Sequence, residues 1–239
     1  MWYSADALLE RPAVRGPSVT TKATYQIMTK PRVLLADDHL MVAEGLKGIL
    51  AEDFELVGIV EDGRAMVSAA RELHPDVIVA DISMPNLNGI DALVLLKRDC
   101  PKVRVVFLTM HRDAAYARRA LDAGASGYVL KHSAPAELLL AVRAALAGRT
   151  FVTPDLAGEL LRLGKRDSVM PADPVAAITP RQREILQLVA EGKAAKEIGA
   201  LLGISPRTVE DHKYRLMEAL SIVNSAELVH FAIKHGIVQ

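Results

Sequence analysis

The chain has 239 residues, of which 51% are hydrophobic and 24% are charged, a composition typical of a soluble globular protein with room for two modest domains. Lysine plus arginine and aspartate plus glutamate number 29 each, so the net charge neither predicts nor excludes a polyanionic partner. The single cysteine, Cys100, excludes an internal disulfide and is expected to pack at a helix end. No apolar run reaches the roughly 18 residues that a membrane-spanning helix needs. We therefore expect a cytoplasmic protein without a membrane partner.

The first thirty residues differ from the rest of the sequence. Residues 1–30 combine prolines, a glycine and a Ser/Thr cluster without a regular apolar period, and they lack an apolar segment of signal-peptide length. We expect a disordered extension there. Met28 stands directly before the first predicted strand, so Met1 and Met28 are both candidate translation starts.

From residue 31 to about residue 150, short apolar runs alternate with segments of helical spacing. Unalternated, β-branched runs are typical of strands buried on both faces of a parallel sheet. The predicted strands are residues 32–36, 55–60, 76–80, 103–108 and 128–130. The first predicted helix has Met41, Leu46, Ile49 and Leu50 at helical spacing. This order predicts an α/β doubly wound, flavodoxin-like domain, which binds ligands at the carboxyl ends of its strands.

Polar side chains follow four of these strands at the point where each strand ends. Asp37 and Asp38 follow the first, Asp81 the third, Thr109 the fourth and Lys131 the fifth. We expect them to meet in one crevice. Three adjacent carboxylates need a cation to neutralise them, and carboxylate oxygens suit Mg²⁺. The lysine and the hydroxyl add donors for an anion, which indicates phosphoryl transfer.

Each of these residues has an ordinary structural explanation when taken alone, because an Asp after a strand is often a helix cap and a lysine often reaches to solvent. Together with four motifs, however, they resemble the receiver domains of response regulators. The motifs are LLADDH at residues 34–39, DISMPNLNG at 81–89, FLTMH at 107–111 and GASGYVLK at 124–131.

The resemblance implies a role for each residue of the crevice. Asp81 would be the phosphoacceptor and would take the phosphoryl group from a histidine kinase. Asp38, Asp81 and the Ser83 carbonyl would bind Mg²⁺ directly, and Asp37 would act mainly through a coordinated water. Lys131 would pair with the phosphoryl oxygens. By the same resemblance, the domain would catalyse only its own phosphoryl transfer and dephosphorylation and would not otherwise be an enzyme.

The resemblance also implies a switch and a control of phosphoryl lifetime. Thr109 would hydrogen-bond a phosphoryl oxygen after a small shift, and Tyr128 matches the aromatic residue that then turns inward, although a fixed strand aromatic is the alternative. Ser83 and His111 would flank the path of an attacking water; a solvent-facing loop histidine is the alternative for His111. The segment MPNLNG, in which Gly89 permits a positive φ, is predicted to turn from the strand into the next helix.

Residues 151–177 are predicted to connect this receiver domain, residues 31–150, to a second domain over residues 178–239. TPDLAGELLRL at residues 153–163 has an early proline and leucines at helical spacing, which favours one amphipathic helix. Residues 164–177 contain a glycine and two prolines without periodicity, which is typical of a flexible tether.

The last sixty residues show only helical patterns. A Thr-Pro pair at residues 179–180 begins a helix that ends at Gly192, and further helices are expected over residues 193–202, from 206 to about 220, and from 225 to about 235. Residues 178–220 resemble the LuxR-type helix-turn-helix of NarL/FixJ regulators. The two resemblances together imply a phosphorylation-dependent, DNA-binding transcriptional regulator of a two-component system.

By this resemblance, the helix from residue 206 is the recognition helix and promoter DNA is the partner. Six of its residues would face the major groove and two residues would touch phosphates: Arg207, Thr208, Glu210, Asp211, Lys213 and Tyr214 at the groove, and Lys196 and His212 at phosphates. Val209 would pack inside.

Residues 178–239 carry eight Lys/Arg and seven Asp/Glu, so attraction to phosphates is modest. Glu210 and Asp211 would either read bases or complement the helix dipole. A phosphate sink or protein-binding regulator without specific DNA binding is the alternative function.

The resemblance finally implies that the unphosphorylated receiver masks the recognition helix and that phosphorylation frees it to form a homodimer. The last helix, residues 225–235, would carry the contact. Its apolar residues are candidates either for that contact or for the core: Leu228, Val229, Ala232 and Ile233.

Overall fold

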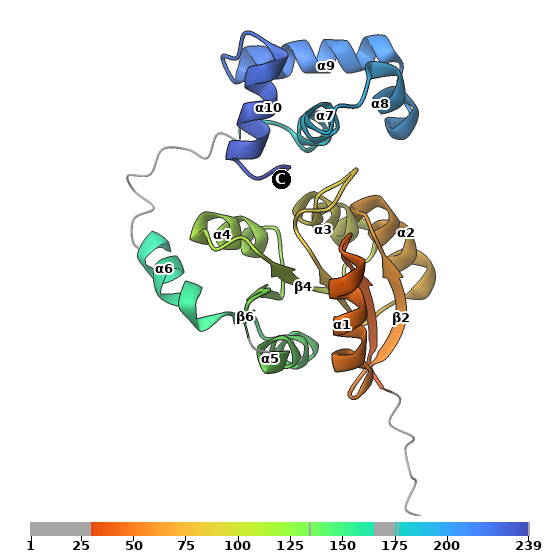
Figure 1. Ribbon diagram of the computed structural model, residues 1–239, viewed down its shortest axis with the longest axis vertical. Helices are drawn as coiled ribbons and strands as arrows, with labels where there is room; N and C mark the ends of the chain where they lie inside the picture. The colour runs from red at the N-terminus through yellow and green to blue at the C-terminus, as the bar shows by residue number, and fades with distance from the viewer. Residues whose placement is uncertain (1–29, 134, 165–174, 176, 239) are drawn as a thin grey trace, which may run out of the picture.

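A computed structural model describes residues 30–133, 135–164, 175 and 177–238 of the chain. Nearly all of the expected N-terminal extension and most of the expected tether lie outside these residues. The described residues form an α/β lobe and a helical lobe (Figure 1).

The α/β lobe is built on a six-stranded parallel sheet with the order β2-β1-β3-β4-β5-β6. Its strands are β1 (Arg32–Ala36), β2 (Glu55–Val60), β3 (Val77–Ala80), β4 (Arg104–Thr109), β5 (Gly127–Leu130) and β6 (Phe151–Val152). The first five confirm the predicted strands to within a residue or two. The short β6, which pairs with β5, was not predicted because two residues are too few to show a period.

Helices cover both faces of the sheet. They are α1 (Leu40–Ala51), α2 (Gly63–Leu73), α3 (Gly89–Asp99), α4 (Ala114–Asp122), α5 (Pro135–Leu146) and α6 (Pro154–Gly164). One apolar cluster joins one face to α1 and α5, and a second joins the other face to α2, α3 and α4. The predicted doubly wound α/β fold is thereby confirmed, and α6 confirms the predicted connecting helix.

Two details of packing differ from the expectations. Met41 is 91% exposed, because Ala43 and Leu50 are the residues of α1 that face the core. The strand β2 is only half-buried, because it lies at the edge of the sheet.

The helical lobe contains α7 (Pro180–Ala190), α8 (Ala195–Leu202), α9 (Pro206–Ala219) and α10 (Ser225–Lys234). Thr179 caps α7 in a capping box with Gln182, as the Thr-Pro pair predicted. Gly203 takes a positive φ of 65° in the turn between α8 and α9, and Ser205 caps α9. These local signals confirm the predicted helix-turn-helix.

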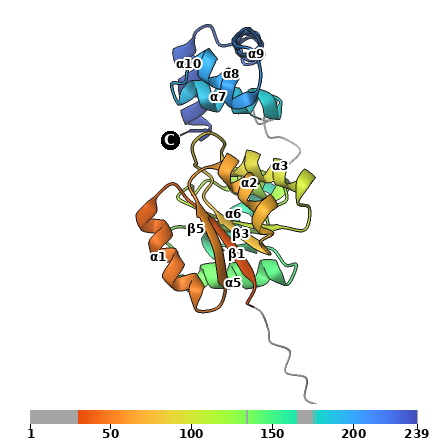
Figure 2. The same cartoon turned by 90° about the vertical axis from the view of Figure 1, so that its right-hand side faces the viewer.

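The two lobes meet through α7, which lies over α3 and the loop before it (Figure 2). The helix α9, which is the expected recognition helix, lies on the other side of the helical lobe, away from the α/β lobe (Figure 1). Arg207, Glu210 and Tyr214 on α9 are exposed. The expected masking of α9 is therefore wrong for this structure, because the α/β lobe packs on α7, a different helix of the same lobe.

The loop from β3 to α3 turns differently from the expectation. The residue of this loop with a positive φ is Asn86, at 64°. Gly89 is required for a different reason, namely that its neighbours leave no room for a side chain. A Cβ on Gly89 would overlap the carbonyl of Asp81 and the ring of Phe107. This glycine therefore allows the start of α3 to lie against the end of β3.

We expect Gly89→Ala to lower the free energy of unfolding by about 1–3 kcal/mol, because the loop must move to relieve the overlap. Gly45→Ala in α1 is the matched control, since a Cβ there meets nothing within 4 Å. In the control, alanine should raise the stability by about 0.5–1 kcal/mol. Urea unfolding measures both, and equal stability of the two variants would contradict the packing described.

Candidate functional site

The carboxyl ends of β1, β3 and β5 bring three predicted residues into contact. The Lys131 Nζ atom lies 2.8 Å from Asp37 Oδ2 and 2.6 Å from Asp81 Oδ2. Both aspartates are buried. The register of the sheet explains why the two aspartates lie close together. Ala36 and Ala80, the last residues of β1 and β3, pair with each other, and Asp37 and Asp81 directly follow them. The lysine therefore holds two buried carboxylates together.

The remaining carboxylate, that of Asp38, lies at the more exposed mouth of the crevice. Ligand atoms of Asp37, Asp38, His39 and Asp81 all lie within 4.8 Å of one another. Three carboxylates at this spacing fit a divalent cation that prefers oxygen ligands. The arrangement thus brings the three predicted acidic residues together at one possible cation site.

His39 is a member of this cluster to which the sequence analysis gave no role. Its backbone N–H donates to Asp37 Oδ1 at 2.9 Å, and its ring Nδ1 lies 2.9 Å from Asp38 Oδ1. The one feature of the sequence that could have predicted this is that His39 directly follows Asp37 and Asp38. The imidazole orients the carboxylates at the mouth of the crevice.

Burial dominates the electrostatics of the crevice. Burial raises the pKa of Asp81, and the hydrogen bond and charge of Lys131 offset this only in part. Burial alone would lower the pKa of Lys131, but its hydrogen bonds to Asp37 and Asp81 raise it. The lysine is consequently a positive charge beside a carboxyl group, Asp81, whose ionised form burial disfavours.

The loop after β4 contributes Thr109 and His111. Thr109 is buried, and its hydroxyl accepts a hydrogen bond from the backbone N–H of His111 at 3.3 Å. The His111 Nε2 atom lies 2.8 Å from Ser83 Oγ, and its ring stacks on Tyr116 with centroids 4.6 Å apart. Burial lowers the pKa of His111. This histidine is therefore half-buried and paired, and the alternative of a solvent-facing residue is wrong.

Tyr128 is fully buried on β5, and its hydroxyl donates to the His111 carbonyl at 2.9 Å. Burial also raises the pKa of this phenol, which keeps it protonated and able to donate. The ring is thus in the inward position that the resemblance assigns to the switched state.

A second set of predicted residues lies on the outer face of the helical lobe. Arg207, Glu210, Asp211 and Tyr214 are exposed on α9, as is Lys196 on α8. The half-buried members of the set are Thr208, His212 and Lys213. Val209 is buried, as predicted.

One ion pair lies within this face, because the Lys213 Nζ atom is 3.9 Å from Glu210 Oε2. Five of the eight predicted DNA contacts are therefore exposed and three are half-buried, and Lys213 lies beside Glu210.

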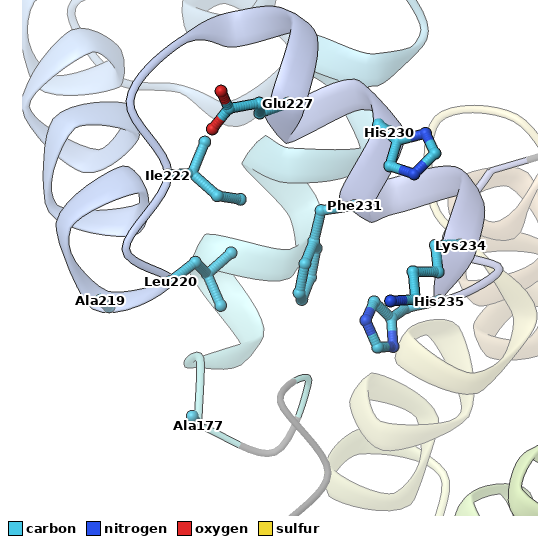
Figure 3. A pocket seen from close by; sticks show the side chains of 9 residues that line it. All are labelled: Ala177, Ala219, Leu220, Ile222, Glu227, His230, Phe231, Lys234 and His235. Carbon is cyan, nitrogen blue, oxygen red and sulfur yellow. The ribbon is translucent and has the colours of Figure 1, made fainter.

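A groove of about 430 Å³ runs beside α10 and the end of α9 (Figure 3). Its walls include Leu220, Phe231 and His235. Of the candidate contact residues on α10, Leu228 and Ala232 are buried in the core of the lobe, whereas Ile233 is 52% exposed. Val229 is half-buried. Only part of the apolar face of α10 is therefore available to a partner.

Comparison with known proteins gives matches to both lobes. Residues 33–143 match the family model "Response regulator receiver domain", and residues 176–232 match "Bacterial regulatory proteins, luxR family". The transcriptional regulatory protein MctR of Rhizobium johnstonii is 37% identical over 87% of this chain and 96% of its own length. The chain belongs to the response regulators of the NarL/FixJ type. Such a regulator binds DNA and controls transcription, which favours this function over a phosphate sink.

Other response regulators of this type resemble the chain over both lobes. The response regulator UvrY of Escherichia coli is 32% identical over 86% of this chain and 94% of its own. A structure of RcsB from Salmonella typhimurium has a TM-score of 0.61 and 29% identity, covering 87% of this chain and 99% of that one. A second RcsB structure, bound to promoter DNA with the phosphomimetic BeF3-, has a TM-score of 0.58 and 29% identity, covering 85% and 98%. Among the described residues of this response regulator, no helix has the length and apolarity to span a membrane.

Without divalent cations, we expect Asp81→Asn to raise the free energy of unfolding at neutral pH. Folding raises the pKa of Asp81, so the ionised carboxylate opposes folding above that pKa. The difference between wild type and Asp81→Asn disappears as the pH falls toward the pKa of Asp81 in the unfolded chain. Plots of the free energy of unfolding against pH should therefore converge in acid for the two proteins. Thermal unfolding in EDTA across a pH series measures this. An Asn variant that is less stable than wild type at neutral pH would contradict the assignment.

Proposed function

We propose that this response regulator accepts a phosphoryl group on Asp81 from a histidine kinase and then acts on transcription through a DNA-bound homodimer. The observation that carries the proposal is the Lys131 ammonium, which lies between Asp37 and Asp81 at the carboxyl edge of the sheet. A fixed cation beside a buried carboxylate stabilises the phosphoryl oxygens that the carboxylate acquires.

The proposed ligands of Mg²⁺ are Asp38, Asp81 and the Ser83 carbonyl, with Asp37 acting through a water. This role is supported by the spacing of the carboxylates and by the raised pKa of Asp81. When bound, the ion neutralises charge between the carboxylates and an anionic donor.

In the proposed reaction, an Asp81 carboxylate oxygen attacks the phosphorus of a phosphohistidine in line. The new O–P bond forms as the P–N bond of the donor breaks, and the departing imidazole keeps the electron pair and takes up a proton. Lys131 and Thr109 then hold the phosphoryl oxygens. Ser83 and His111, which are joined by a hydrogen bond, flank the path of the water that later hydrolyses the acyl phosphate.

The proposed switch couples Thr109 to Tyr128 through the backbone between them. Thr109 and Tyr128 both hydrogen-bond the backbone of His111, so a shift of the threonine moves the acceptor of the tyrosine. The added charge of roughly −1.5 to −2 is sufficient to draw such donors inward. We assign residues 31–150 to the receiver domain and residues 178–239 to the DNA-binding domain, with residues 151–177 between them.

Phosphorylation by acetyl phosphate should require Mg²⁺ or Mn²⁺ and should be lost in Asp81→Asn, which lacks the nucleophilic oxygen. Asp38→Asn should reduce the rate at low Mg²⁺ and recover in part at high Mg²⁺, because it removes one ligand charge. Gels that retard phosphorylated protein measure the rate. Undiminished phosphorylation in excess EDTA, or a retarded band for the Asp81→Asn variant, would disprove the assignment of the site.

For the DNA-binding domain, we expect Lys213→Ala to weaken binding to all sequences, by a uniform factor, since a lysine attracts phosphates. Glu210→Ala should instead change the sequence preference, because a carboxylate can accept from a cytosine amino group. Binding of the phosphorylated protein to a panel of promoter variants separates the two. A uniform change for both variants would mean that Glu210 reads no base and acts only on Lys213.

A further inference from the structure

Helix α7 of the DNA-binding domain is hydrogen-bonded to the loop that follows Asp81. The Gln187 Nε2 group donates to the Met84 carbonyl at 2.8 Å, and Gln187 Oε1 accepts from the Asn88 N–H at 2.7 Å. Glu191 Oε1 accepts from the Asn86 N–H at 3.0 Å. Two side chains of one domain therefore satisfy three backbone groups in a single loop of the other domain.

This contact is buried although it is polar. Gln187 is 1% exposed and Asn88 is 3% exposed. An ion pair of 2.8 Å between Arg183 and Asp91 stands beside them. Buried backbone groups need hydrogen-bond partners, so the loop and α7 stabilise each other in this one arrangement.

The same loop begins at the phosphorylation site. The Ile82 N–H donates to Asp81 Oδ1 at 2.6 Å, and the Gly89 N–H donates to the Ile82 carbonyl at 2.8 Å, which closes the loop on itself. Ser83, the proposed source of a metal-binding carbonyl, lies between Asp81 and the Met84 carbonyl held by Gln187. A restraint on Met84 therefore acts one residue from that proposed ligand.

The DNA-binding domain also reaches the second loop beside Asp81, indirectly, through Tyr116 on α4. Ser83 is joined to His111, whose ring stacks on Tyr116. The Tyr116 hydroxyl in turn lies so close to Gly236 that a Cβ there would overlap it. The helical lobe thus contacts the β3–α3 loop directly and the loop after β4 through Tyr116. These two loops carry Ser83 and follow Thr109, the residues proposed to engage the metal ion and the phosphoryl group.

We propose that Gln187 is a positioning residue for phosphoryl transfer: through its hydrogen bonds to Met84 and Asn88, α7 restrains the β3–α3 loop and slows phosphorylation of Asp81. The inference rests on the proposed function of Asp81. Because coupling between two sites is reciprocal, phosphorylation weakens the contact between α7 and the loop to the same extent.

The test uses the full-length protein with acetyl phosphate and Mg²⁺. Gln187→Ala should be phosphorylated about fivefold faster than wild type, at the lower end of usual allosteric coupling. Gln182→Ala is the matched control, since it removes the same side chain from the same helix, but from a capping box with Thr179. The control should react at the wild-type rate, although the cap of α7 is weakened.

Hydrogen exchange at the amides of Asn86 and Asn88 gives a second readout that a loss of stability in the helical lobe would not reproduce. Exchange should be faster in Gln187→Ala than in wild type, should rise in wild type on phosphorylation, and should stay at the wild-type level in Gln182→Ala.

An unchanged or slower rate in Gln187→Ala would overturn the inference, as would an equal acceleration in Gln182→Ala. Unchanged exchange at both amides would do the same. Failure of wild type itself to become phosphorylated would overturn the proposed function, and with it this inference, so the two failures are distinguishable.

Discussion

One ammonium group shared by two buried carboxylates is the interaction on which the rest of the structure depends. Asp37 and Asp81 end neighbouring strands in register, so a parallel sheet of this order places them side by side away from water. Lys131, at the end of β5, compensates their repulsion. The compensation is incomplete, because the pKa of Asp81 stays raised. The crevice therefore favours a further cation and, with it, an incoming anion.

The DNA-binding domain contacts the β3–α3 loop directly through α7, and it reaches the loop after β4 through Tyr116 of α4, which lies against Gly236. The helix α9 lies on the far side of the helical lobe, with Arg207, Glu210 and Tyr214 exposed. Because the receiver does not cover the residues expected to meet DNA, we propose that control acts through the β3–α3 loop and α7.

Much of the fold and of the receiver crevice could be predicted from sequence, because the signals are local. Strands buried on both faces read as apolar runs, and polar residues at their ends must converge when the strands are parallel. The predictions about Met41 and Gly89 were wrong for tertiary reasons, namely which side of α1 faces the core and how closely α3 approaches β3. Gln187 gave no signal, because a glutamine on an amphipathic helix is normally solvated and only the neighbouring domain buries it.

The central claim, that the carboxylate beside Lys131 receives the phosphoryl group, is tested most directly by locating the modified residue. Borohydride reduces an aspartyl phosphate to homoserine, so peptide mass spectrometry after phosphorylation and reduction identifies the acceptor. We predict homoserine at position 81 alone. Homoserine at position 37 or 38, or phosphate retained on a histidine with residue 81 unmodified, would contradict it.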